Sequence, residues 1–103
     1  MQEETIRTLC AAGNWLISAH ARKRMIQRGI TTAEIERALM TGKIIEDYPE
    51  AYYGPACLLL ALSSPGTPLH IVCGENGGSL FVITAYRPNP EKWDASFRKR
   101  RNV

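Results

Sequence analysis

The chain has 103 residues, 45% of them apolar and 22% charged, which suits one domain spanning 1–103 and excludes wholesale disorder. Its formal net charge is +3, its longest apolar run is too short to cross a bilayer, and its acidic start does not resemble a signal peptide. We therefore expect a soluble, cytoplasmic protein that has no membrane partner.

Helical patterns dominate the first part of the chain. The spacing of apolar residues predicts a helix over 2–12, which ends at a Gly-Asn pair. Ser18 is a good N-cap for a second helix over 19–28, and Gly29 suits the left-handed position that ends it. Thr31 and Glu34 form a capping box that starts a third helix, ending at Gly42. Residues 15–17 are either a first strand or an extended connector.

Extended patterns follow after residue 42. Strands are expected over 43–48, 57–62, 69–74 and 79–86, with turns at 63–68 and 75–78. The strand over 57–62 is apolar on both faces, which is typical of an interior strand. A short C-terminal helix is expected from Asn89 onward, carrying Trp93 and Phe97 as core anchors. The fold class is therefore α+β, with N-terminal helices packed on a three- to four-stranded antiparallel sheet.

The three cysteines, Cys10, Cys57 and Cys73, are too far apart to form a metal-ligand motif with each other or with a histidine. Two of them lie in apolar runs, where free cysteine serves as a small core residue. We interpret all three as reduced and structural, and the sequence gives no reason to expect a metal or another cofactor.

Positive charge is concentrated in two places. Residues 20–28 contain four basic side chains and no acid, residues 98–101 contain four more, and residues 29–90 contain three basic and six acidic ones. Two such clusters on a nearly neutral body suggest a polyanionic partner, with RNA or DNA foremost. A solubilising surface with a basic tail explains the charge alone equally well.

His20, Arg24 and Arg28 form one stripe on the second helix, because they are spaced four residues apart. Guanidinium groups bind phosphate oxygens and stabilise the extra negative charge of a pentavalent transition state, and histidine moves protons near neutral pH. The stripe therefore suits phosphodiester chemistry. The alternative is a solvated helix face.

Other candidate residues have two interpretations each. Tyr86, at the end of the last strand, either binds a phosphate or base or is a half-buried strand aromatic. His70 is more simply a packed, hydrogen-bonded strand residue, and whether it faces the site or the core depends on strand register. The basic residues expected to contact an RNA backbone, unless the tail is frayed, are Lys23, Arg87, Lys99, Arg100 and Arg101.

The order of several short motifs resembles the domain-of-unknown-function 4258 family of small bacterial proteins. The resemblance covers about residues 15–101, and its motifs lie at Ser18–Ile30, 42–46, 68–72, 83–88 and Trp93–Arg100. That family is similar to RelE-like and BrnT-like toxins of type II toxin–antitoxin systems. The resemblance implies a compact sheet packed by N-terminal helices, RNA cleavage without a metal, and a zinc-finger or helix-turn-helix antitoxin as partner. Matched residue by residue, it points to His20, Arg24, Arg28, Tyr86 and Arg100.

The leading hypothesis is a toxin-like endoribonuclease, an mRNA interferase that cleaves RNA by transesterification. His20 would be the general acid or base, Arg24 and Arg28 would hold the scissile phosphate, and Tyr86 would orient it or stack on a base. RelE-like ribonucleases, however, place basic residues along the sheet, whereas these strands are poor in lysine and arginine. Two alternatives remain: a non-catalytic RNA- or DNA-binding module, and a protein-interaction domain whose acidic middle seats a basic segment.

Overall fold

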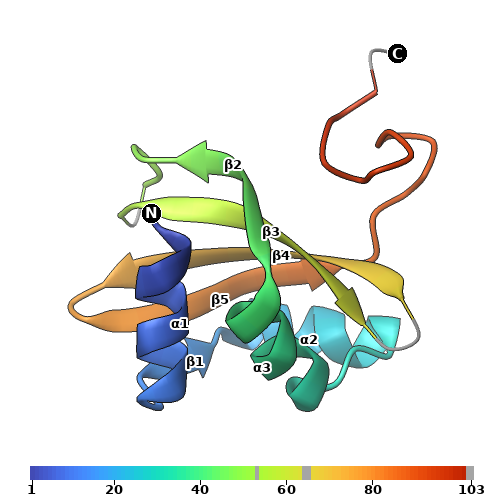
Figure 1. Ribbon diagram of the computed structural model, residues 1–103. Helices are drawn as coiled ribbons and strands as arrows, with labels where there is room; N and C mark the ends of the chain where they lie inside the picture. Colours follow the sequence, from blue (N-terminus) through green and yellow to red (C-terminus); the bar gives the residue numbers. More distant parts are fainter. Residues whose placement is uncertain (53, 64–65, 102–103) are drawn as a thin grey trace.

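A computed structural model describes residues 1–52, 54–63 and 66–101, and its centre is one mixed five-stranded sheet (Figure 1). The strands lie in the order β1-β5-β4-β3-β2. Their bounds are Trp15–Ile17 for β1, Lys43–Tyr48 for β2, Ala56–Ser63 for β3, Thr67–Asn76 for β4 and Ser79–Tyr86 for β5.

The prediction of three to four antiparallel strands was wrong in one respect, because β1 adds a fifth strand that pairs in parallel with β5. Trp15 aligns with Leu80 and Ile17 with Val82. A strand of three residues is too short to carry an alternating pattern, so its pairing is decided by the neighbouring strand and not by its own sequence. The other neighbouring strands pair antiparallel, as expected.

Local signals at the strands and turns gave correct predictions. Strand β3 lies between β2 and β4 and is buried on both faces over most of its length, as its apolar run indicated. Gly77 and Gly78 both have positive φ, which is the geometry of the tight hairpin expected between β4 and β5. The turn predicted at 63–68 includes Ser64 and Pro65, which lie outside the described residues.

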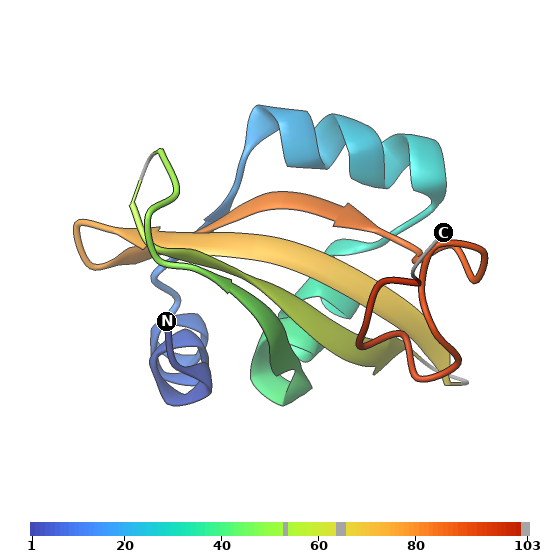
Figure 2. The ribbon, with the colours of Figure 1, turned by 90° about the horizontal axis from the view of Figure 1, so that it is seen from above.

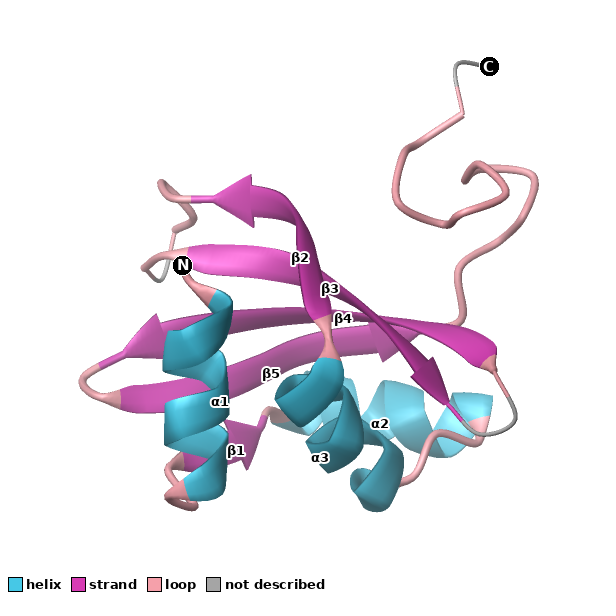
Figure 3. Ribbon diagram, in the orientation of Figure 1, coloured by secondary structure: helices cyan, strands magenta, loops and turns pink. Residues whose placement is uncertain are grey.

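Three helices cover one face of the sheet, as Figure 3 shows. They are α1 over Glu3–Ala11, α2 over Ala19–Arg28 and α3 over Thr32–Thr41. Helix α2 packs on β5, α3 packs on β3, and α1 packs on α3 and the sheet. The core between them contains the apolar faces of all three helices and the inward positions of β3, β4 and β5. Cys10, Cys57 and Cys73 are free and buried, as predicted.

The opposite face of the sheet is covered at one end by residues 87–101, which we call the C-terminal segment (Figures 1 and 2). The C-terminal helix predicted from Asn89 onward is not formed, and the segment consists of turns and one bridge between Trp93 and Arg100. Two side chains explain this difference. Asn89 accepts a hydrogen bond from the backbone N–H of Glu91, and Asp94 accepts hydrogen bonds from the backbone N–H groups of Ser96 and Arg98. Such local bonds compete with helix formation. Phe97 at φ 60 then reverses the chain.

Within the described parts of the chain, no helix combines the length and apolar character needed to span a membrane.

Candidate nucleic-acid interface

Helix α2 places Arg28 beside the end of β5. The side chain of Ser18 caps the first turn by accepting a bond from Ala21 N, and Gly29 ends the helix with φ 66, as predicted from the sequence. Arg28 therefore lies in the last turn, and its Nη1 donates to the carbonyl of Ala85 at 2.7 Å. One guanidinium edge is held in this way, while the side chain as a whole stays exposed.

Tyr86 and His70 face each other on the side of the sheet away from the helices. They are direct partners in the β4–β5 register, and His70 Nδ1 lies 3.2 Å from the Tyr86 hydroxyl. His70 is fully buried, so the prediction of a packed, hydrogen-bonded histidine is confirmed. Because the buried His70 also contacts the hydroxyl of Tyr86, it positions a side chain of the candidate site.

The contacts of His70 define its tautomer. Its Nε2 is 2.8 Å from the carbonyl of Phe97, which can only accept, so Nε2 carries the proton and Nδ1 accepts from Tyr86. Burial lowers the pKa of His70, more than the carbonyl of Phe97 and the charge of Glu46 raise it. Burial also raises the pKa of Tyr86. At neutral pH the pair is therefore a neutral imidazole that accepts a hydrogen bond from a neutral phenol.

The C-terminal segment brings Arg100 to the same end of the sheet as Tyr86. Arg100 forms a two-pronged ion pair with Glu46, with Nε–Oε2 at 3.0 Å and Nη2–Oε1 at 3.1 Å. Its guanidinium lies 4.7 Å from the ring centre of Trp93, which suits a cation–π contact. Trp93 is buried, as predicted, and packs edge-on against His70. Burial alone raises the pKa of Glu46, but bonds from Arg100 and Tyr48 lower it below its ordinary value.

These elements surround an open groove of about 420 Å³, lined by Arg28, Tyr86, Arg87, Asn89, Lys92, Trp93 and Arg100. Four of the lining side chains are basic and none is acidic. Arg87 is paired with Glu34 at 2.8 Å and Arg100 with Glu46, whereas Arg28 and Lys92 have no carboxylate partner among the described residues. The groove therefore has a net positive charge, and we call it the basic groove.

The basic groove brings together four of the predicted residues: Arg28, Tyr86, Arg87 and Arg100. It does not include His20, which lies in the first turn of α2 and lines a separate, mainly apolar pocket with Phe81 and Ile83 of β5. Eight residues of helix separate His20 from Arg28, or about 12 Å along the axis. The role predicted for His20 has no supporting contact in this arrangement and stays a prediction.

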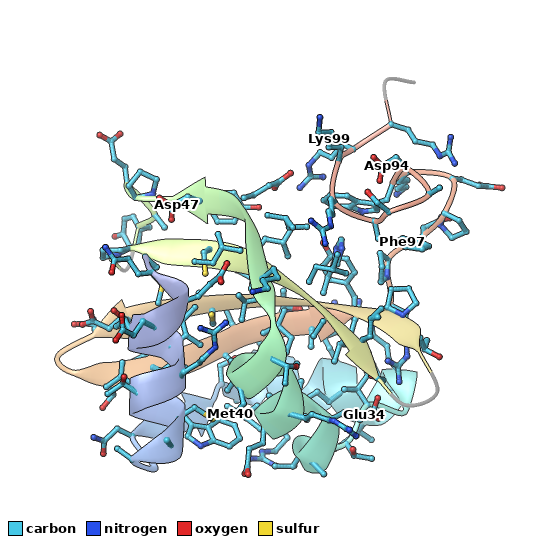
Figure 4. All side chains as sticks on the ribbon, in the orientation of Figure 1. Glu34, Met40, Asp47, Asp94, Phe97 and Lys99 are labelled. Atoms are coloured by element: carbon cyan, nitrogen blue, oxygen red, sulfur yellow. The ribbon has the colours of Figure 1, made fainter. Side chains whose placement is uncertain are left out.

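The remaining predicted residues lie elsewhere. Arg24 bonds Gln27 on its own helix, and Lys23 and Lys99 are exposed outside the groove. Figure 4 shows Lys99 on the side of the C-terminal segment that points away from the sheet. Arg101 donates to the carbonyls of Pro90 and Trp93, so it closes the segment on itself.

Sequence reasoning missed Lys92 and Glu46 and left open whether His70 faces the site or the core. The alternation of β4 and β5 places His70 and Tyr86 on their strands, but only the pairing register makes them neighbours. Lys92 had been assigned to a helix that does not form. No group of three or more histidine, cysteine or acidic side chains among residues 1–52, 54–63 and 66–101 could hold a metal ion.

The fold and the groove thus define a small α+β protein with a cationic groove at one end of its sheet. The family model of a domain of unknown function, DUF4258, matches residues 17–87, and the chain belongs to this family. No curated protein and no solved structure matches the chain. The family match includes α2, β4 and β5, hence Arg28, His70 and Tyr86, and ends where the C-terminal segment begins.

Proposed function

We propose that this protein is an endoribonuclease that binds a phosphodiester of RNA in the basic groove and cleaves it with its own side chains. The observation that carries the proposal is that Tyr86 lines a groove together with four basic side chains, while the buried His70 contacts its hydroxyl from behind. Cations alone would indicate only phosphate binding. A phenol with a buried proton acceptor behind it adds a means of moving a proton.

Phosphate binding is assigned to Arg28 and Lys92, because their charges are not neutralised by a carboxylate among the described residues. Arg28 has one guanidinium edge fixed on Ala85 and can offer the other edge to two phosphate oxygens. Arg100 and Arg87 contribute positive field but remain tied to Glu46 and Glu34.

Cleavage then follows the usual course of transesterification at a ribose. The 2′-oxygen forms a bond to phosphorus while the bond to the 5′-oxygen breaks. The 2′-hydroxyl proton passes to the oxygen of Tyr86 as the phenol proton moves to Nδ1 of His70, and the Lys92 ammonium gives a proton to the leaving 5′-oxygen. Arg28 stabilises the charge on the phosphorane. The products are a 2′,3′-cyclic phosphate and a 5′-hydroxyl end.

The test is incubation of the purified protein with single-stranded RNA, with the ends of the products identified. We expect cyclic phosphate ends from the wild type and a cleavage rate about 100-fold lower for Tyr86→Phe, which removes the proton carrier. Arg22→Ala is the control, because Arg22 is exposed on α2 and lines neither the basic groove nor the pocket beside His20. Equal cleavage by Tyr86→Phe and the wild type would refute the mechanism.

A non-catalytic RNA- or DNA-binding module is the second candidate. One observation favours it. Two of the four basic residues in the groove already have carboxylate partners, and such ion pairs hold the side chains of a binding surface in place without taking part in a reaction. Wild-type protein that binds RNA in a salt-sensitive manner and leaves it intact would establish this second function in place of the first.

The proposal extends to a toxin role with a small antitoxin as partner. Induced expression in a bacterial host, with growth and total RNA followed together, tests it. Growth arrest with RNA fragmentation, both lost in Arg28→Ala and both relieved by the protein encoded beside the gene, is the expected result. Normal growth at a high level of folded protein would contradict the toxin role.

A further inference from the structure

A second basic groove lies on the other side of the C-terminal segment. It encloses about 560 Å³ and is lined by Arg37, Thr41, Lys43, Leu60, Ala61, Leu62, Ser96 and Arg98. Its residues come from α3, the start of β2, the end of β3 and the C-terminal segment. No lining residue is shared with the groove that contains Tyr86.

Charge in this second groove is positive and only partly compensated. Three of its lining residues are basic and none is acidic. Within the described part of the chain, Lys43 is paired with Glu3 at 3.8 Å, while Arg37 and Arg98 have no ion pair. Leu62, whose side chain is largely exposed, adds an apolar surface beside the cations. The cations suit a phosphate, and the exposed leucine suits the base next to it.

The two grooves lie at opposite ends of one register row across the sheet. Tyr86 pairs with His70, His70 with Leu60, and Leu60 with Lys43. Three steps between strands span about 14 Å. The C-terminal segment lies between the grooves and contributes to both, with Arg100 in the first and Arg98 in the second.

We propose that the second groove binds backbone phosphates that flank the phosphodiester in the basic groove, so that the ligand is a single strand of RNA spanning both. This inference rests on the proposed function for the identity of the ligand. A strand that leaves one groove and enters the other must bend around the C-terminal segment, which a single strand does and a stiff duplex does not. A dinucleotide, in contrast, fills the first groove alone.

The experiment compares two ligands that cannot be cleaved, a single-stranded 2′-O-methyl oligoribonucleotide and a 2′-O-methyl dinucleotide. Arg37→Ala is the test variant and Arg22→Ala the matched control, because both arginines are exposed on helices and only Arg37 lines a groove. We expect Arg37→Ala to weaken oligoribonucleotide binding about tenfold, as for loss of a charged hydrogen bond. Its salt dependence should fall by about 0.7 in slope, and dinucleotide binding should not change.

The outcomes separate this inference from the proposed cleavage. Binding that depends on Arg37, by a wild type that never cuts RNA, would support the second groove and refute the nuclease. Equal oligoribonucleotide binding by Arg37→Ala and Arg22→Ala would overturn the second groove, while loss of binding in Arg28→Ala would leave the first in place. Polyglutamate bound as tightly as the oligoribonucleotide, and dependent on Arg37, would also overturn it, in favour of an acidic protein segment.

Discussion

The pair of Tyr86 and His70 makes a pH prediction, because the proton acceptor must be neutral. Burial keeps the pKa of His70 below its ordinary value of 6.5, so the imidazole still accepts a proton at neutral pH. We expect the cleavage rate to stay constant near neutrality and to fall only in acid, as pH drops through this lowered pKa. The measurement is the rate against pH at saturating RNA. If the rate began to fall on acidification while the pH was still above 6.5, the role of His70 would be contradicted.

Glu34 makes a second prediction at the scale of one residue. Hydrogen bonding from Arg87, together with the capping contact to Thr31 and a hydrogen bond from Ser63, lowers the pKa of Glu34 from 4.5 to about 2. A folded-state pKa below the unfolded value gives stability that is present above about 4.5 and is lost as pH falls toward 2. Because the pair is partly exposed, we expect Glu34→Gln to lose about 1 kcal/mol at neutral pH.

Urea unfolding of the wild type and Glu34→Gln at several pH values checks this prediction. The difference in unfolding free energy should shrink as the solution is acidified, because both proteins are then uncharged at this position. Glu36→Gln, an exposed change on the same helix, is the control and should stay close to the wild type throughout. A difference that does not depend on pH would show that the charge of Glu34 does not stabilise the fold.

At the scale of elements, sequence prediction succeeded where the signal is local. The caps at Ser18 and Thr31, and the glycine that ends α2, act within one turn and were all predicted. Strand β1 has no pattern of its own, and the C-terminal segment has a helical pattern that Asp94 overrides with local bonds. Tertiary pairing decides the first case and local side-chain bonding the second.

The candidate site divides in the same way. Arg28 was predicted from the four-residue spacing of a basic stripe on one helix, and Tyr86 from its place at the end of the last strand. The contact between Tyr86 and His70 was not predicted, because it depends on the β4–β5 register and on a bulge between Val72 and Cys73. Sequence alternation identifies a face of a strand, but it cannot say which residue of the next strand lies opposite.

The junction between α3 and β2 allows a prediction about an element boundary. A Cβ added at Gly42 would lie 2.6 Å from the carbonyl oxygen of Ala38 and 3.4 Å from Cβ of Leu59. Because a backbone oxygen cannot turn away as a side chain can, we expect Gly42→Ala to lose about 1–3 kcal/mol of unfolding free energy. Gly29→Asn is the comparison, since position 29 has open space and asparagine tolerates its positive φ. Equal urea midpoints for Gly42→Ala and the wild type would contradict the clash.

At the scale of the whole molecule, the sheet is protected differently on its two faces. Helices bury one face in a continuous core. On the other face Leu58, Leu60 and His70 are buried as well, and the C-terminal segment covers that end of the sheet through Trp93. Residues 88–101 of the segment lie outside the family match at 17–87, and yet they contribute to both grooves. It is therefore expected to support both stability and RNA binding.

Deletion of residues 88–103 tests both roles together. The deletion removes the buried Trp93 and uncovers His70, and loss of a buried tryptophan side chain alone costs about 3–5 kcal/mol. We expect the free energy of unfolding to fall by at least that amount, which lowers the urea midpoint. RNA binding should be weak even at low temperature, where the shortened chain is still folded, because Lys92 and Arg100 are gone. Deletion of 102–103 alone keeps both groove-lining sets and is the control. An unchanged midpoint with loss of RNA binding would show that the segment serves the ligand and not the fold, and an unchanged affinity would place the RNA on α2 and the sheet instead.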